Sequence, residues 1–430
     1  MEEWKEYKLG DIAQVKGGKR LPKGVNLVKA KNSHPYIRVR DLGKKKVLEL
    51  DSSFEYVDNE TQKSISRYIV NSGDIIVSIV GTIGLIAIIG NSLDKANLTE
   101  NCVKLIDITA IDKEYLYYYL VSELGKNEIE KGIVGAVQAK LPIKNIQAIN
   151  IKAPNLESQR RIASILKSLD DKIEVNRRIN ENLEQQAQAL FKSWFVDFEP
   201  FLDKPSGKAE RKNGEFVESE LGIIPKGWRV GTLDEIGDVV GGSTPSKSKP
   251  EFYTDKGIAW LTPKDLSISN NKFTAKGEID ITEEGYKSCS TKLMPKGSVL
   301  FSSRAPIGYI TIAKNDICTN QGFKSVVPKL AGTAFIYYFL KISTKDIENK
   351  ATGSTFKEAS GALMKSLQLI IAPERILHDF ENIMKPLFTQ QEVLEDESRR
   401  LAELRDTLLP KLMSGEFFAS KASQAPSESK

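Results

Sequence analysis

Apolar residues recur every three and four positions along two long stretches of the chain, one near its middle and one near its C-terminal end. In the first stretch they form two seven-residue series, which make an a/d stripe over about four heptads. These series are Ile162, Leu169, Asn176, Leu183, Leu190 and Leu166, Ile173, Asn180, Ala187, Trp194. The second stretch carries the series Phe380, Leu387, Leu394, Leu401, Leu408. The pattern predicts two long helical stretches, 155–200 and 374–416, and a first helix from about Leu156 to Phe198 would be roughly 60 Å long.

The stripes indicate packed helices but leave their partners open. The two helices could pair with each other, or each could pair with another chain; we expect pairing within the chain, because it carries two matching stripes. Asn176 and Asn180 would either set the register of the pair or face water near a helix crossing. Pro386 and Pro410 predict that the second helix starts late or is kinked.

The rest of the chain consists of short β-rich runs separated by Gly and Pro turns, and its sequence contains an internal repeat. The pattern Trp4-x4-Leu9-x2-Ile12-x2-Val15-x-Gly17-Gly18 recurs 224 residues later, from Trp228 to Gly242. The segment YLYYYL (115–120) likewise returns as FIYYFL (335–340). A duplicated domain with a few insertions or deletions explains these offsets.

One uncharged run, Ile75–Leu93, is long enough to cross a bilayer. It is rich in β-branched residues and interrupted by glycines, which favours buried strands joined by a turn. The second copy places Arg304 in the equivalent segment, which argues against a membrane helix. We therefore expect a strand pair and no membrane association.

Composition places the chain among folded proteins of two or three domains, with 430 residues of which 40% are apolar. Its three cysteines lack C-x-x-C spacing, and there are two histidines, so we expect neither a disulfide framework nor a metal site. The first residues, MEEWKEYKLG, contain no apolar segment typical of a signal peptide, and we expect a cytoplasmic location.

Charge is distributed unevenly along the chain. Residues 1–154 carry 23 basic and 19 acidic groups, residues 227–373 carry 19 and 14, and the two helical stretches are net acidic. Within the first segment, residues 16–46 contain eleven Lys and Arg against one Asp. Such a basic region is typical of a polyanion-binding surface, although a solvated, lysine-rich surface would look the same.

We select the candidate nucleic-acid contacts from this region and from its counterpart in the second copy. Alternation in YIRVRDL would place Arg38 and Arg40 on one strand face, and small residues and backbone N–H groups in GGSTPSKSKP could bind a phosphate. For each arginine, a role in a structural salt bridge is an equally good interpretation as a contact with DNA. The full set of candidates is Lys16, Lys19, Arg20, Arg38, Arg40, Lys44, Ser243, Thr244, Lys247, Lys249, Lys264 and Arg304.

Catalytic motifs are missing from the sequence. It has no phosphate-binding G-x-x-x-x-G-K-[ST] loop, no Asn/Asp-Pro-Pro-aromatic tetrapeptide, and no G-x-G-x-x-G after a strand. His34 and His378 fall in unrelated contexts, so a Ser/His/Asp set is not expected. We therefore expect no catalysis by this chain and no cofactor bound to it.

The combination of duplication and particular helix-end motifs resembles the specificity (S) subunits of type I restriction–modification systems. The resemblance covers nearly the whole chain, and it is carried by PNLESQRRIASILKSLDDKIEVNRRINENLEQQAQALFKSWFVDFEP (154–200), ESELGIIPKGW (218–228), GSTPSKSKPEFY, GIAWLTPKDL, TGSTFKEAS (352–360) and RDTLLPKLMSGEF (405–417).

The resemblance implies an α+β chain with two target recognition domains, each reading one half of a bipartite double-stranded DNA site in the major groove. It also implies that the helices form an antiparallel coiled-coil spacer that binds two methyltransferase (M) subunits, with restriction (R) subunits joining. S-adenosylmethionine, ATP and Mg²⁺ would then be bound by those partners. The spacer residues would be Ile162, Leu169, Asn176, Asn180, Leu183, Leu190, Trp194, Leu387, Leu394, Leu401 and Leu408.

The expected organisation is a first recognition domain (1–154), a central helix (155–200), a linker (201–226), a second recognition domain (227–373), a C-terminal helix (374–416) and a disordered tail (417–430). Because the two recognition domains differ in detail, we expect the two half-sites to differ in sequence. Two other interpretations stay open at this point. One is a DNA-binding scaffold outside restriction systems, and the other is an enzyme with an unrecognised site.

Overall fold

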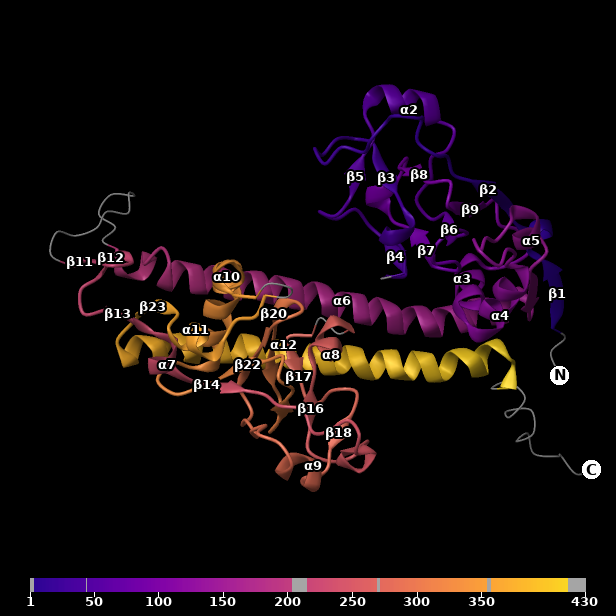
Figure 1. Cartoon of the computed structure of the whole chain (residues 1–430). Coiled ribbons are helices and arrows are strands. Elements are labelled where there is room, and N and C mark those ends of the chain that lie inside the picture. Colours follow the sequence, from indigo (N-terminus) through magenta and orange to yellow (C-terminus); the bar gives the residue numbers. More distant parts are fainter. Residues whose placement is uncertain (1–3, 44, 203–214, 269–270, 354–356, 417–430) are drawn as a thin grey trace, which may run out of the picture. The chain divides into compact units, whose positions relative to one another are not determined.

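The computed structural model describes residues 4–43, 45–202, 215–268, 271–353 and 357–416 (Figure 1). The chain divides into two compact units, unit 1 (1–174 and 399–430) and unit 2 (175–398). Both long helices, α6 (Leu156–Phe195) and α12 (Glu374–Met413), contribute a segment to each unit. The helices therefore do not form a body separate from the globular parts.

Unit 1 is built around a five-stranded sheet in the order β2-β9-β6-β7-β4. Its strands are β2 (Gln14–Gly17), β9 (Cys102–Ile106), β6 (Ile75–Ser78), β7 (Ile86–Ile89) and β4 (Val47–Leu48). Smaller sheets join β5 (Glu55–Tyr56), β3 (Pro35–Ile37) and β8 (Asn97–Leu98), and β1 (Lys5–Lys8) and β10 (Asn150–Ala153). The short helices are α1 (Leu9–Ile12), α2 (Asn59–Ile65), α3 (Lys113–Val121), α4 (Glu123–Gly132) and α5 (Ile143–Gln147).

Unit 2 contains a sheet of the same size in the order β14-β22-β19-β20-β17. Its strands are β14 (Gly237–Gly241), β22 (Lys324–Pro328), β19 (Val299–Ser303), β20 (Ile307–Ala313) and β17 (Phe273–Thr274). Two-stranded sheets pair β13 (Arg229–Thr232) with β23 (Gln368–Ile371), β15 (Tyr253–Thr254) with β18 (Asp280–Ile281), and β16 (Trp260–Leu261) with β21 (Cys318–Thr319). The short helices are α7 (Leu233–Ile236), α8 (Pro263–Ile268), α9 (Glu283–Lys287), α10 (Thr333–Lys350) and α11 (Gly361–Lys365). A hairpin, β11 (Phe216–Ser219) and β12 (Gly222–Pro225), lies in the stretch expected to be a linker.

The two five-stranded sheets share one topology, which confirms the duplication. In each, four strands pair antiparallel and the edge strand pairs parallel, with Val47 opposite Ile88 in unit 1 and Phe273 opposite Ile312 in unit 2. The repeated Gly-Gly motif has a packing reason, because a Cβ on Gly18 would lie 2.0 Å from the carbonyl oxygen of Thr99. A Cβ on Gly242 would lie equally close to the carbonyl oxygen of Asn320.

The uncharged run Ile75–Leu93 forms strands β6 and β7, which pair antiparallel with Ile75 opposite Ile88. Both strands are buried on both faces, since Ile75 packs into one hydrophobic cluster and Ile76 into another. Burial on two faces explains a continuous apolar run without a membrane. Among the described residues, no helix is long and apolar enough to cross a bilayer.

Helices α6 and α12 pair with each other, as expected, and they run antiparallel. In unit 1 Asp170 contacts Arg405, and in unit 2 Asn176 contacts Glu397 and Asn180 contacts Gln391. As the residue number rises along α6, the residue number of its contact on α12 falls, which is the antiparallel order.

The expectation of a late start of the second helix is wrong, because α12 begins at Glu374 and continues through Pro386 over 40 residues. Pro386 lies on the exposed face, where the carbonyl group that loses its helical hydrogen bond can meet water. Pro410 is also exposed and lies in the last turn, where few helical hydrogen bonds follow it.

The predicted stripe faces the helix pair and the cores. Asn176 is buried and its amide donates to Glu397 Oε2 at 2.7 Å, so it does not face water. Among the other members, Ile162, Leu183 and Leu394 are buried, and Leu169, Asn180, Leu190, Trp194, Leu387, Leu401 and Leu408 are partly buried.

Each core is completed by a helix end that comes from the other copy of the repeat. In unit 1, Leu412 and Met413 of α12 join the cluster formed by α3 and the start of α6. In unit 2, Phe191 and Phe195 of α6 pack against Phe335 and Phe380. Neither copy of the repeat therefore buries its own core alone.

Candidate nucleic-acid interface

The end of the unit 1 sheet at which β2 finishes carries three of the candidate basic residues, with Lys16 on β2 and Lys19 and Arg20 on the loop that follows. At this end β2 and β6 finish and β9 starts, and Gly18 N donates to the carbonyl oxygen of Cys102 at 3.0 Å. Lys19 N donates in turn to the carbonyl oxygen of Leu98 at 2.8 Å. The loop after β2 is thus held against the start of β9, and its side chains are left on the surface.

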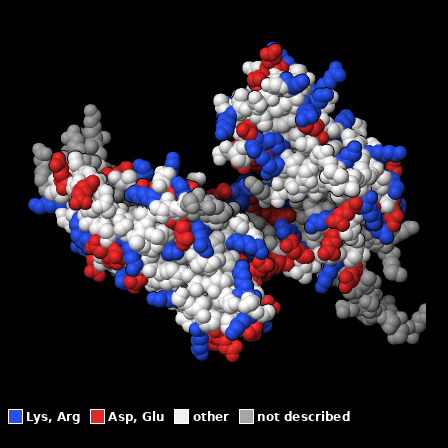
Figure 2. Space-filling view, in the orientation of Figure 1, with Lys and Arg blue, Asp and Glu red and all other residues white. Residues whose placement is uncertain are grey.

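Lysines of this loop are exposed and available to a polyanion. No carboxylate of the described residues forms an ion pair with Lys16, Lys19, Lys23, Lys29 or Lys31. Arg20 lies 3.6 Å from Glu100, at a cavity of about 670 Å³ beside them. Figure 2 shows Lys and Arg side chains over the part of unit 1 that carries α2, β3 and β5.

Arg38 and Arg40 do not lie on a strand face, so that expectation is wrong. Strand β3 ends at Ile37, and residues Val39–Asp41 form a 3-10 turn. The Arg38 side chain is 14% exposed and pairs with Asp41 and Glu55, and Arg40 also pairs with Glu55. The structure therefore supports the salt-bridge interpretation for both arginines. Lys44 lies outside the described residues.

Unit 2 presents the equivalent sheet end with fewer free charges. Lys247 and Lys249 are exposed and form no ion pair with the described residues, and Lys249 lies 5.0 Å from the ring centre of Phe252. Lys264 is exposed and pairs with Glu278 at 2.8 Å. Arg304 is partly exposed and pairs with Glu358 at 3.4 Å, so its salt-bridge interpretation is also supported.

The expected phosphate-binding role of the GGSTPSKSKP backbone is not supported at its start. Gly242 N and Ser243 N donate to the carbonyl oxygens of Phe323 and Thr319, so these N–H groups are already used. The Thr244 hydroxyl donates to Gln321. The loop is fixed by these bonds, and its lysines remain the groups that can reach a polyanion.

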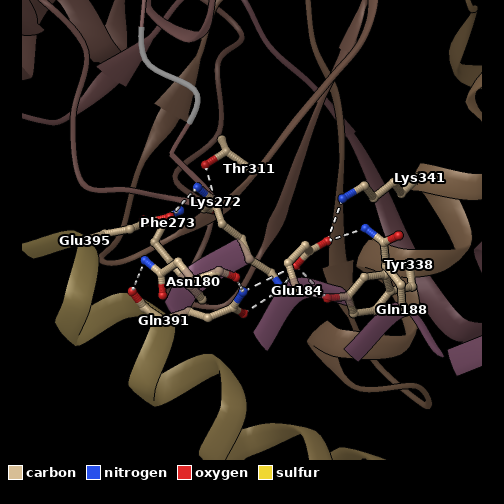
Figure 3. Close-up of polar contacts among 10 residues, drawn as sticks. All are labelled: Asn180, Glu184, Gln188, Lys272, Phe273, Thr311, Tyr338, Lys341, Gln391 and Glu395. Atoms are coloured by element: carbon tan, nitrogen blue, oxygen red, sulfur yellow. Dashed lines mark hydrogen bonds and ion pairs between the residues drawn. The ribbon is translucent and has the colours of Figure 1, made fainter. Parts of the chain in front are cut away.

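A buried lysine that the sequence did not reveal connects the unit 2 sheet to both long helices (Figure 3). Lys272, which precedes β17, is 7% exposed and donates to Glu184 on α6 at 2.8 Å, Gln391 on α12 at 2.9 Å and Tyr338 on α10 at 2.8 Å. Its ammonium group also lies 3.7 Å from the ring centre of Phe388. One cation thus joins the strand to three helices.

The same arrangement recurs in unit 1. Lys46, which precedes β4, donates to Tyr118 at 2.9 Å, and Tyr118 donates to Asp170 of α6 at 2.6 Å. Arg405 of α12 completes the network through Asp170 at 2.8 Å. Lys46 belongs to the basic run 16–46, but its side chain is 11% exposed and its role is structural. The signal in the sequence is a lysine before the edge strand and a tyrosine in the matching helix, repeated in both copies.

Burial and charge act in opposite directions on these groups. Burial lowers the pKa of Lys272 to about 8, although Glu184 opposes this shift. Burial would raise the pKa of Glu184, but Lys272, with hydrogen bonds from Gln188 and Lys341, lowers it to about 2. Glu395 accepts from Lys272 N and Phe273 N, yet burial dominates and raises its pKa to about 7. At neutral pH the Lys272–Glu184 pair is therefore ionised.

Among the described residues, no group of three or more His, Cys, Asp or Glu is arranged to hold a metal ion. The free thiols Cys102 and Cys318 are buried, and burial raises the pKa of both.

Comparison with known proteins identifies the family to which the chain belongs. The profile of the family described as "Type I restriction modification DNA specificity domain" matches residues 1–185 and 225–400, one match in each copy of the repeat. The chain belongs to the family of type I restriction–modification specificity subunits.

Two relatives of this specificity subunit show how far the similarity extends. It is 27% identical over 478 residues to the HindI specificity subunit of Haemophilus influenzae, covering 97% of this chain and all of that one. A 191-residue stretch is 40% identical to the MjaIX specificity subunit of Methanocaldococcus jannaschii, covering 42% of this chain and 44% of that relative. A crystal structure of an S subunit from M. genitalium has the same fold, with a TM-score of 0.61, 16% identity and 96% of each chain covered.

We predict that Glu184→Gln destabilises unit 2 by about 3–5 kcal/mol, because it leaves the buried Lys272 ammonium without its carboxylate. Urea unfolding followed by tryptophan fluorescence measures this, since Trp194, Trp228 and Trp260 lie in unit 2. Glu181→Gln is the matched control, because Glu181 lies one turn earlier in an exposed pair with Arg177 and should change stability by less than about 0.5 kcal/mol. Equal effects from both substitutions would contradict the role given to Lys272.

We also predict that Glu395 makes unit 2 less stable as pH rises from about 5 to 7.5. Its pKa is higher in the folded state than in the unfolded chain, so the folded state binds more protons in this window and loses stability as they leave. Relative to Glu395→Gln, which keeps an acceptor oxygen, the wild-type free energy of unfolding should fall by about 2–3 kcal/mol. Parallel pH profiles for the two proteins would refute this assignment.

Proposed function

We propose that each unit of this specificity subunit reads one half of a bipartite, asymmetric site on double-stranded DNA. The proposal rests on the position of lysines that form no ion pair with the described residues. In both copies such lysines lie on the loop that follows the first strand of the five-stranded sheet, Lys19 and Lys23 after β2 and Lys247 and Lys249 after β14. Phosphate contacts of this kind supply affinity and orientation, while base contacts supply sequence preference.

Differences between the two surfaces support an asymmetric site. Residues 16–31 of unit 1 include five lysines without ion pairs among the described residues, whereas the equivalent loop of unit 2 presents Lys247 and Lys249. At the equivalent turn, unit 1 has Val80 and unit 2 has Arg304. Surfaces with different side chains at equivalent positions favour different base sequences.

The long helices supply a surface for partner subunits, which we propose are two methyltransferase subunits. Ile165 and Val175 are exposed on α6, and their counterparts 218 residues later, Ile383 and Val393, are exposed on α12. Exposed apolar positions repeated on both helices suit one kind of partner bound twice. A groove lined by Pro386, Thr389 and Val393 accompanies the α12 copy.

In this proposal the chain supplies recognition and assembly, and its partners supply the chemistry. Methyltransferase subunits would bind S-adenosylmethionine, and restriction subunits would bind ATP and Mg²⁺. The complex would act on DNA in the cytoplasm. Co-purification with a methyltransferase subunit and genome-wide mapping of methylated adenine with and without this chain test the proposal.

We predict that Lys19→Ala combined with Lys23→Ala weakens DNA binding by a similar factor for every sequence tested. These side chains would bind phosphates, so the slope of log affinity against log salt should fall in magnitude by about 0.9 for each lysine that no longer neutralises a phosphate. Lys152→Ala is the control, because Lys152 already pairs with Glu6. An unchanged salt slope in the double variant would contradict this surface.

We further predict that Val175→Asp and Val393→Asp each remove one of two bound methyltransferase subunits, because each places a charge on one copy of the surface. Native mass spectrometry of the complex counts the subunits. Val217→Asp, at an exposed valine of the β11–β12 hairpin, should leave two bound. Retention of both subunits in the Val175→Asp, Val393→Asp double variant would exclude this surface.

A further inference from the structure

A short hairpin projects from unit 1 between α4 and α5. Its base is closed by two backbone bonds, in which Val134 N and Lys140 N each donate to the other residue's carbonyl oxygen at 2.9 Å. The turn between them is tight, since Gly135 has a φ of +96° and a Cβ there would lie 2.6 Å from the carbonyl oxygen of Gln138. The backbone of the hairpin is therefore well defined.

Side chains at the tip are apolar or amide-bearing, and they contribute nothing to the core. Val137 is fully exposed, and Ala136, Gln138 and Ala139 are also exposed. No hydrogen bond within the described part of the chain involves the Gln138 side chain. The tip therefore presents one apolar side chain and one amide to solvent, outside the hydrophobic core of unit 1.

The hairpin adjoins the candidate nucleic-acid interface. Lys140 forms a bridge with Val80, and Leu141 N donates to the carbonyl oxygen of Ile79 at 2.9 Å. Ile79 N in turn donates to the carbonyl oxygen of Asn101, beside the start of β9 that holds the loop after β2. With neighbouring strands about 4.8 Å apart, three such steps separate the hairpin base from Gly18, which is roughly 14 Å along the sheet.

Charge around the hairpin suits a polyanion. Residues 131–156 contain no Asp or Glu, and of their four lysines Lys140 and Lys144 form no ion pair with the described residues, whereas Lys131 pairs with Glu128 and Lys152 with Glu6. The base of the hairpin has a counterpart in unit 2, where Thr352 and Glu358 pair through their backbones 218 residues later. The repeat has thus kept this backbone pairing at the same place in both copies.

We propose that residues 134–140 enter the major groove, with the Gln138 amide reading an adenine and Val137 contacting a thymine methyl group. A two-stranded ribbon fits this groove, and a glutamine amide can donate to adenine N7 and accept from its N6 amino group. This assignment rests on the proposed function and adds to it the residues that read bases, which the basic loop alone does not provide.

The test uses the full chain in complex with its methyltransferase subunit. Methylation mapping of the wild-type complex first gives the target, and an absence of any preferred sequence at this step would reject the proposed function itself. Binding is then measured by fluorescence anisotropy on the target duplex and on duplexes that carry each base-pair change in the first half-site.

Gln138→Ala should weaken binding to the intact target roughly 5- to 150-fold, and it should remove the penalty for changing one A·T pair. Val137→Ala should reduce the penalty at a neighbouring position. Gln138→Glu should shift the preference at the same position towards a C·G pair, because a carboxylate accepts from the cytosine amino group. Val217→Ala, at a valine exposed on another hairpin, should change none of these values.

Three outcomes would overturn the proposal. In the first, the variants match the wild type on every duplex. In the second, they bind every duplex more weakly by the same factor, which would assign the hairpin to phosphate binding. In the third, they no longer bind the methyltransferase subunit, which would make the hairpin a protein-binding element.

Discussion

The exchange of helix ends between the two copies of the repeat is the constraint on which the rest of this structure depends. Unit 1 is completed by Leu412 and Met413 of α12, and unit 2 by Phe191 and Phe195 of α6. Because each copy leaves apolar surface that only the other copy covers, folding joins the duplicated segments into one molecule. The antiparallel pairing of α6 with α12 follows from this exchange, since each helix starts in one unit and ends in the other.

A buried lysine attaches each sheet to the helix pair, and the repeat has kept the lysine and its tyrosine while changing how the charge is balanced. In unit 1, Lys46 pairs with Glu114 of α3 at 2.5 Å, and Tyr118 connects it to Asp170 of α6. In unit 2, Glu184 lies on the part of α6 contributed by the other copy. A buried ammonium group requires a nearby carboxylate. Different carboxylates meet this requirement in the two units, and the edge strand, the tyrosine-bearing helix and α6 keep the same arrangement in both. These hydrogen bonds fix the sheet of each unit, and with it the candidate nucleic-acid interface, against the long helices. Base recognition requires a rigid support of this kind.

The architecture could be predicted largely from the sequence, whereas the environment of individual charges could not. The duplication, the paired helices, the strand pair in Ile75–Leu93 and the family all followed from periodicity, offsets and motifs. The placement of Arg38 and Arg40 failed because their partner Glu55 is brought close only by folding. The structural role of Lys46 was missed for the same reason, since its tyrosine partner is 72 residues away. The effect of Pro386 on the start of the second helix was overestimated because the residue lies on the exposed face, where the carbonyl group that loses its helical hydrogen bond can meet water.

Amide hydrogen exchange on the full chain carrying Leu412→Asp tests the exchange of helix ends most directly. The substitution places a charge where α12 enters the core of unit 1. Faster hydrogen exchange is expected in α3 and in residues 156–174 of α6, with that of the unit 2 sheet unchanged. The corresponding substitution in unit 2, Phe191→Asp, should speed hydrogen exchange in α10 and leave the hydrogen exchange of unit 1 unchanged. If Leu412→Asp leaves the hydrogen exchange of α3 as it is in the wild type, unit 1 does not depend on α12 and the central claim is contradicted.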